Sequence, residues 1–239
     1  MNLVRTIDPS NHTAYSINLE RDSFNPEVIN DYQITPKTRE VLLRFVNALE
    51  GEKVSAWEII GPYGMGKSSF LNYLVTVAAS NNNTATKIAL DKLKQIDSGL
   101  YIRFINAKNK NTDDRGFLSI PVTADFEPVN RTIVRGLRKM ILASHNIKYK
   151  KIQEKVERIL ASDNIESPMV IDCFRELRKI DSRPIIIAID EFGKNLEYMG
   201  YYHKKGDLFV LQQLAEMNSI YLWVSLHHSF NDYLIGLST

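Results

Sequence analysis

One stretch of eight residues restricts the fold of this chain more than any other feature. Glycines occupy positions 61, 64 and 66, and Lys67 and Ser68 follow the last of them directly. The apolar run Val54–Ile60 before the glycines is typical of a buried strand, and Ser68–Val75 after them has helical apolar spacing. A strand, a glycine-rich loop and a helix in this order predict an α/β fold whose first crossover binds a ligand.

The composition of this loop indicates phosphate binding. Glycines let backbone N–H groups converge on an anion, and the N-terminus of the following helix adds partial positive charge. A lysine and a hydroxyl at the helix start suit phosphate and Mg²⁺, respectively. A chance glycine turn is the alternative, and the flanking strand and helix argue against it. We expect nine residues to contact the nucleotide: Gly61, Pro62, Tyr63, Gly64, Met65, Gly66, Lys67, Ser68 and Ser69.

A second motif supplies carboxylates. Pro184–Ile189 is continuously apolar, as expected of a parallel strand covered on both faces, and Asp190 and Glu191 follow it. Carboxylates at the carboxyl end of such a strand lie at the mouth of the ligand crevice. Asp190 is therefore a candidate Mg²⁺ ligand, and Glu191 a candidate base for an attacking water. The adjacent glutamate favours hydrolysis over phosphoryl transfer to a metabolite, so a kinase is the least favoured function. An acidic turn exposed to solvent is the alternative.

These two motifs resemble the Walker A and Walker B motifs of additional-strand, catalytic-glutamate ATPases, including the AAA+ and STAND groups. The resemblance implies a three-layer P-loop NTPase core with a mostly parallel sheet, ATP and Mg²⁺ as cofactors, and a polar sensor residue after a later strand. That strand is Ile220–Leu226, and Ser225, His227 and His228 are the sensor candidates. It also implies a segment before the first strand that covers adenine, for which Tyr32 and Ile34 are candidates. An N-terminal helix that only packs on the sheet is the alternative. No guanine-reading motif is visible.

A narrower resemblance concerns Ile189–Tyr198, with support from Leu211–Glu216 and Leu226–Phe230. These runs look like the Walker B extension of large ATPases of bacterial phage-defence islands, such as the BREX-type ATPase. The resemblance covers about residues 54–74 and 184–233. It implies a role in antiviral defence.

Composition sets broad limits. The chain has 239 residues, enough for one α/β domain, and its net charge of +2 gives no general attraction to nucleic acid or membrane. No apolar run reaches the length of a membrane span, the N-terminus lacks a signal-peptide core, and a single cysteine excludes an intrachain disulfide. These features predict a cytoplasmic protein with Cys173 in the core and no structural metal at the His227–His228 pair.

The remaining elements follow from periodicity. We predict β-like pieces at 15–19 and 31–34, a helix from Pro36 to Leu49, strands at 99–106 and 117–123, and a loop at 198–206. Pro121 should make the 117–123 segment an edge strand or an irregular extended segment. Further helices are expected at 85–97, 128–144, 148–161, 167–180 and 207–217.

These elements give two parts: a lead-in segment, 1–50, and an ATPase core, 51–239, with a helical insertion at about 128–180 between the second strand and the Walker B strand. The basic helix in that insertion is expected to present a solvated face, with contact to DNA or an acidic partner as the alternative. Its cations are Lys148, Lys150, Lys151, Lys155 and Arg158.

The resemblance also implies parts that lie after the sensor. A complete AAA+ module adds a fifth strand, an arginine finger and a C-terminal lid, and the last arginine here is Arg183. We therefore expect an N-terminal part of a longer module, or an arginine finger from another subunit of a homo-oligomer or hetero-complex.

The predicted function is Mg²⁺-dependent ATP hydrolysis that drives remodelling or assembly of a macromolecular complex. The alternatives are an ATP-gated switch or scaffold with little turnover and a DNA-engaging loader.

Overall fold

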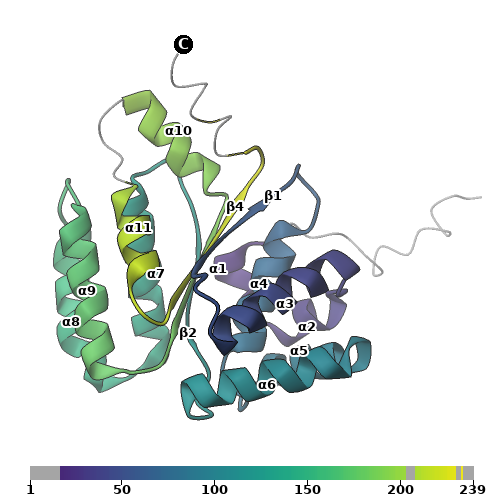
Figure 1. The fold of residues 1–239 in the computed structure, drawn as a ribbon. Coiled ribbons are helices and arrows are strands. Elements are labelled where there is room, and N and C mark those ends of the chain that lie inside the picture. The colour runs from purple at the N-terminus through teal and green to yellow at the C-terminus, as the bar shows by residue number, and fades with distance from the viewer. Residues whose placement is uncertain (1–16, 203–207, 230–232, 234–239) are drawn as a thin grey trace, which may run out of the picture.

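The computed structural model describes residues 17–202, 208–229 and 233, and it contains a four-stranded sheet in which every pairing is parallel. The order across the sheet is β1-β4-β3-β2 (Figure 1). The strands are β1 (Ala56–Ile60), β2 (Leu118–Thr123), β3 (Ile185–Asp190) and β4 (Ile220–Leu226). The two strands in the centre, β3 and β4, are the ones that the sequence predicts to carry the acidic and sensor residues.

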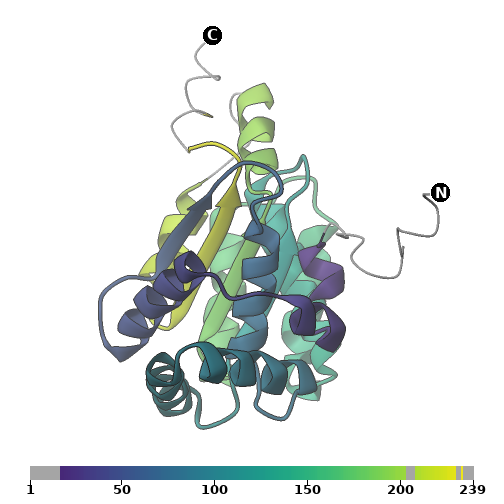
Figure 2. The same ribbon diagram turned by 90° about the vertical axis from the view of Figure 1, so that its right-hand side faces the viewer.

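Helices cover both faces of the sheet, so the chain forms three layers (Figures 1 and 2). One face is covered by α1 (Leu19–Asp22), α2 (Pro26–Asp31), α3 (Pro36–Glu50), α4 (Lys67–Ala78), α5 (Thr84–Ile96) and α6 (Ser98–Thr112). The other is covered by α7 (Val129–Ser144), η2 (Ile147–Tyr149), α8 (Lys150–Leu160), α9 (Ser167–Ile180), α10 (Gly193–Tyr202) and α11 (Phe209–Glu216).

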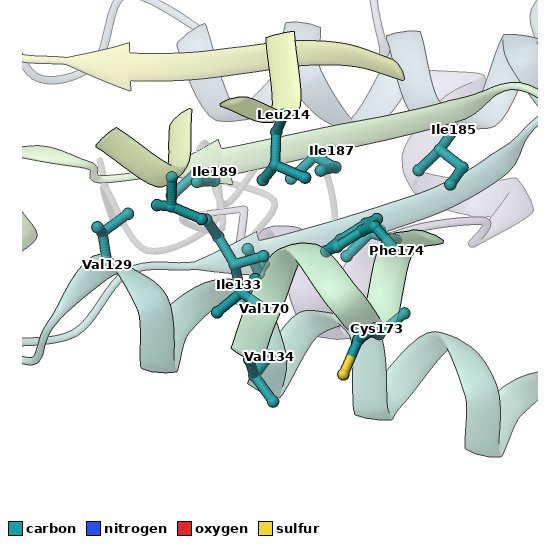
Figure 3. Close-up of a cluster of buried hydrophobic side chains, with 14 of the residues drawn as sticks. Val129, Ile133, Val134, Val170, Cys173, Phe174, Ile185, Ile187, Ile189 and Leu214 are labelled. Carbon is teal, nitrogen blue, oxygen red and sulfur yellow. The ribbon is translucent and has the colours of Figure 1, made fainter. Parts of the chain in front are cut away.

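The strand β3 is buried at every position, as the continuous apolar run predicts. Ile185, Ile187 and Ile189 face the core beneath α7, α9 and α11, as Figure 3 shows, and Ile186 and Ala188 face the core beneath α3 and α4. Alternate side chains of a strand point to opposite faces, so a strand covered twice must be apolar throughout. Cys173 is buried in the first of these cores, as predicted, and burial raises the pKa of its thiol to about 11.

The strand β1 is correctly placed but is not buried. It pairs only with β4 in the part of the chain that the structure describes, and Ala56, Glu58 and Ile60 are exposed. The expectation of a buried strand was wrong because an apolar run does not distinguish a central strand from an edge strand.

The strand β2 forms the opposite edge, as Pro121 predicts. A proline has no N–H to offer to a further strand, and the Thr123 N–H donates to Glu20 Oε1 at 3.0 Å. The same carboxylate contacts Arg135 of α7, so this edge is covered by α1.

Two predicted elements were wrong. Residues 99–106 are not a strand but lie within α6, because the Asp97 carboxylate accepts the Leu100 N–H at 2.9 Å and Leu100, Phe104 and Ala107 share one buried face. Residues 198–202 continue α10 rather than forming a loop, and 203–207 lie outside the described residues.

The N-terminal strands were also wrong. Asn18 and Asn25 cap α1 and α2, whereas α3 begins and ends as predicted, with Thr35 as its cap and Gly51 after its last residue. Residues 15 and 16 lie outside the described part of the chain. The helices expected at 85–97, 128–144, 148–161, 167–180 and 207–217 are all present as α5, α7, α8, α9 and α11.

The three helices between β2 and β3 belong to one face of the sheet. The helix α7 packs directly on β2, and α8 and α9 pack beside it in the same hydrophobic core. Within the described ranges, no helix has the length and apolar character needed to cross a membrane.

Candidate functional site

A cleft of about 310 Å³ opens at the carboxyl edge of the sheet, at the ends of β1, β3 and β4. It brings together most of the residues that the sequence analysis selected from three separate segments. Its walls are Ile17, Tyr63, Gly64, Met65, Gly66, Lys67, Ser68, Ser69, Asp190, Glu191, Ser225 and His227.

The glycine loop between β1 and α4 has the backbone conformation that only glycine adopts easily. Gly64 and Gly66 have φ of 82° and 77°, and Gly66 immediately precedes the first turn of α4. The Gly61 N–H donates to Leu226 O at 3.2 Å, which ties the loop to the end of β4. The first-turn N–H groups of a twelve-residue helix therefore face the cleft, an arrangement suited to an anion.

Lys67 is buried at the floor of the loop. Its ammonium donates to Gly61 O at 2.5 Å and to Pro62 O at 3.0 Å, and it lies 3.4 Å from His227 Nδ1. Burial lowers the pKa of this ammonium, and the nearby Asp190 and Glu191 carboxylates oppose that shift. Gly61 and Pro62 thus serve the site through their carbonyls and do not line the cleft.

Ser225 connects the two central strands. Its hydroxyl donates to Asp190 Oδ1 at 2.5 Å and accepts the Glu191 N–H at 3.0 Å. The Glu191 N–H is also 3.1 Å from Asp190 Oδ1. Ser225 therefore holds the carboxylate of Asp190 and the backbone of Glu191 in a fixed relation.

Glu191 forms an ion pair that the sequence analysis did not include among the site residues. Lys194, in the first turn of α10, lies 2.5 Å from Glu191 Oε2, and this hydrogen bond raises the pKa of the lysine. Both side chains are more than a third exposed, so the pair is accessible to solvent and to ligands. The sequence places Lys194 three residues after Glu191, which predicts a contact with Glu191 or with phosphate, and a lysine facing solvent is the alternative. The helix α10 that carries Lys194 was not predicted.

The remaining candidates are more distant. His228 does not line the cleft, and its ring lies 6.2 Å from that of Tyr233. Tyr32 stacks on Tyr73 at 4.7 Å in the core, and Ile34 packs in the same core, so neither reaches the cleft. Ile17 lines it instead, and no motif in the sequence indicates this residue.

The donor set suits a hard cation. Ser68 and Asp190 both line the cleft and offer a hydroxyl and a carboxylate oxygen. Mg²⁺ takes few protein ligands and keeps several waters, so these two oxygens fit it. Among the described residues, no group of three or more His, Cys, Asp and Glu side chains could hold a metal by itself.

Comparison of the chain with models of known protein families, with curated proteins and with solved structures gives no match.

Proposed function

We propose that this chain binds ATP with Mg²⁺ and hydrolyses it, as a P-loop ATPase of the AAA+-like kind. One observation carries the proposal: Lys67, Ser68, Asp190 and Glu191 line a single cleft beside a left-handed glycine loop at a helix N-terminus. A lysine, a hydroxyl and two carboxylates around an anion-binding loop are the groups that hydrolysis of a nucleoside triphosphate requires.

The glycine loop and the start of α4 bind the triphosphate. The N–H groups of residues 64–69 and the ammonium of Lys67 hold the β- and γ-phosphates, and Lys67 exchanges its bonds to Gly61 O and Pro62 O for bonds to phosphate oxygens. Since burial already disfavours the charged ammonium, a phosphate partner is a favourable replacement for two carbonyls.

Glu191 acts as the base in the hydrolysis step. Ser68 and Asp190 would hold Mg²⁺, which would stabilise the negative charge of the γ-phosphate. Glu191 accepts a proton from the attacking water, and Ser225 fixes the backbone that carries Glu191. We propose His227 as the sensor residue that contacts the γ-phosphate, because its Nδ1 lies 3.4 Å from the Lys67 ammonium.

The biological role that we propose rests on the resemblance to AAA+-like ATPases. We propose that hydrolysis drives remodelling or assembly of a macromolecular complex, with a second subunit supplying an arginine to the γ-phosphate. The antiviral setting rests on the similarity of the Ile189–Tyr198 run to phage-defence ATPases.

The test compares wild type with Lys67→Ala and Glu191→Gln for ATP binding and Mg²⁺-dependent phosphate release. Wild type and Glu191→Gln should bind ATP, Lys67→Ala should bind at least about tenfold more weakly, and Glu191→Gln should lose about 10²-fold or more in turnover. Absence of ATP binding by the wild type would refute the proposal.

One observation favours a second function, an ATP-gated switch with little turnover. Lys194 occupies Oε2 of the Glu191 carboxylate at 2.5 Å, so this oxygen is not free to contact an attacking water. Tight ATP binding by wild type, with equally slow phosphate release in wild type and Glu191→Gln, identifies the switch.

A further inference from the structure

Positive charge is concentrated in one helical layer. Residues 129–183, which form α7, α8 and α9, contain 13 Lys and Arg and 7 Asp and Glu, a net charge of +6. The net charge of the whole chain is +2, so the remainder carries −4. The chain is therefore close to neutral as a whole, although its charge is distributed very unevenly.

Part of this charge lies around Asp181, which follows α9 and precedes β3 at the amino edge of the sheet, opposite the candidate site. Its carboxylate accepts the Tyr149 hydroxyl at 2.7 Å and pairs with Arg183 at 2.9 Å, and Arg115 lies 3.8 Å away. Arg115 comes from the loop before β2, Tyr149 from η2 and Arg183 from the loop before β3. Three connections that are distant in sequence thus meet at one carboxylate.

The lysines around this point lack counter-ions. Lys148 and Lys150 flank Tyr149, Lys151 follows, and Lys179 lies two residues before Asp181. All four are exposed, and among the described residues none forms an ion pair. By contrast, Lys155, further along the same helix, pairs with Glu176 at 2.8 Å.

A groove of about 490 Å³ lies between α1, the end of α4, β2 and the end of α7, and its lining includes Arg183, which contacts the Tyr149 hydroxyl at 3.3 Å. Phe24, Phe117 and Met140 supply apolar walls. Three cations also line the groove: Lys139, which pairs with Glu20, and Arg115 and Arg183, which both lie beside Asp181. Its volume is that of a site for a small organic group. The groove therefore has apolar walls and cationic side chains in the same lining.

We propose that this groove and the adjoining lysines bind single-stranded nucleic acid. A base would enter between the apolar walls, and the backbone phosphates would lie along Arg115, Arg183 and Lys148–Lys151. A duplex keeps its bases inside and cannot insert one, and a flat anionic membrane cannot reach apolar walls that are set inside a concavity. The proposal does not depend on ATP, because this surface and the candidate site lie at opposite edges of the sheet.

The first experiment measures fluorescence anisotropy of labelled dT20 and rU20 without nucleotide. Lys148→Gln/Lys150→Gln/Lys151→Gln is compared with Lys53→Gln/Lys87→Gln/Lys110→Gln, which removes the same charge from exposed positions elsewhere. The first triple should weaken binding about tenfold or more and reduce the salt slope by about two, since each neutralised phosphate contributes about 0.7 on single strands. The second should change binding less than threefold.

The groove is tested separately by filling it. Ala143 is exposed and lines the groove, whereas its neighbour Leu142 is exposed and does not. Ala143→Trp should weaken dT20 binding at least fivefold, and Leu142→Trp should leave it unchanged. Thermal unfolding of both variants confirms that they remain folded.

Three results would overturn the proposal: equal weakening by the two lysine triples, binding of duplex as tight as that of single strands, or binding to anionic phosphatidylserine vesicles but not to oligonucleotides. Repeating the titration with Lys67→Ala keeps this outcome separate from that of the ATPase proposal, because that variant should bind oligonucleotide normally.

Discussion

The backbone conformation of Glu191 determines where its side chain points. Its φ is 54°, in the left-handed region, where a residue with a side chain costs about 1–2 kcal/mol. Two acceptors, Asp190 Oδ1 and Ser225 Oγ, hold the Glu191 N–H in that conformation. The strained backbone turns the side chain into the cleft immediately after β3 ends, so the strain has a role in the site that we propose.

At the same scale, the ion pair between Lys194 and Glu191 restrains the proposed base. Lys194→Gln removes the pair, and we expect phosphate release to rise by up to about fivefold, because a half-exposed pair is worth about 0–1 kcal/mol. Steady-state turnover measured beside the control Lys53→Gln checks this. A rate that falls in Lys194→Gln would show that the lysine contacts phosphate instead of restraining the base.

At the scale of the element, α7 packs directly on β2 at Gly136, which has no side chain. A Cβ built on Gly136 would lie 2.9 Å from Ile120 Cγ2 and 3.0 Å from Val122 Cβ. Both contacts are with buried, β-branched side chains that have little freedom to move. Gly99, in the first turn of α6, has no such neighbour.

These two helical glycines should respond oppositely to alanine. Gly136→Ala should lower the free energy of unfolding by about 1–3 kcal/mol through overpacking. Gly99→Ala should raise it by about 0.5 kcal/mol, because alanine has the better helix propensity and a more restricted unfolded state. Urea unfolding of both variants measures the difference, and an unchanged or more stable Gly136→Ala would mean that α7 can move away from β2.

The element scale also shows where the sequence was ambiguous. Residues 99–106 carry apolar side chains that fit a strand or a helix, and the strand was predicted. Helix-capping residues distinguish a helix from a strand in such segments. Asp97 before α6 and the asparagines before α1 and α2 are capping residues that the sequence contains and the prediction did not use. The helix α3 was predicted correctly because Thr35, Pro36 and Gly51 mark both of its ends.

At the scale of the whole molecule, the face of the sheet that carries α1–α6 encloses a charged group. Lys108 of α6 is fully buried, and its ammonium donates to Val77 O at 2.9 Å, near the end of α4, and to Asn81 Oδ1 at 2.8 Å. Burial lowers the pKa of this ammonium to about 8. The favourable position at a helix C-terminus does not fully offset the loss of hydration.

This buried lysine makes global stability depend on pH. The unfolded chain holds the Lys108 proton up to its ordinary pKa of 10.5 and the folded chain only to about 8, so between these values the unfolded state binds more protons. Stability should therefore rise with pH, by about 1 kcal/mol between pH 8 and 9. This rise in stability ends near pH 10, where Tyr73 of the unfolded chain begins to lose its proton. Burial raises the pKa of Tyr73 in the folded chain, so the folded state then binds more protons and stability falls with pH.

Urea unfolding at pH 7, 8 and 9 checks this dependence. Lys108→Met removes the titrating group, so the rise should be absent in that variant whatever its stability at pH 7. An equal rise in both proteins would assign the effect to other groups.

By itself, the sequence determined the α/β class, the succession of most helices, the parallel strand β3 and nearly all residues of the cleft. It could do so because glycine φ, strand apolarity and helix periodicity are local properties of consecutive residues. Tertiary structure alone decided that β1 lies exposed at an edge, that Ile17 rather than Tyr32 reaches the cleft, and that Arg115, Tyr149 and Arg183 meet at Asp181. These outcomes depend on which segments pack against each other across long loops, and no local pattern encodes such partners.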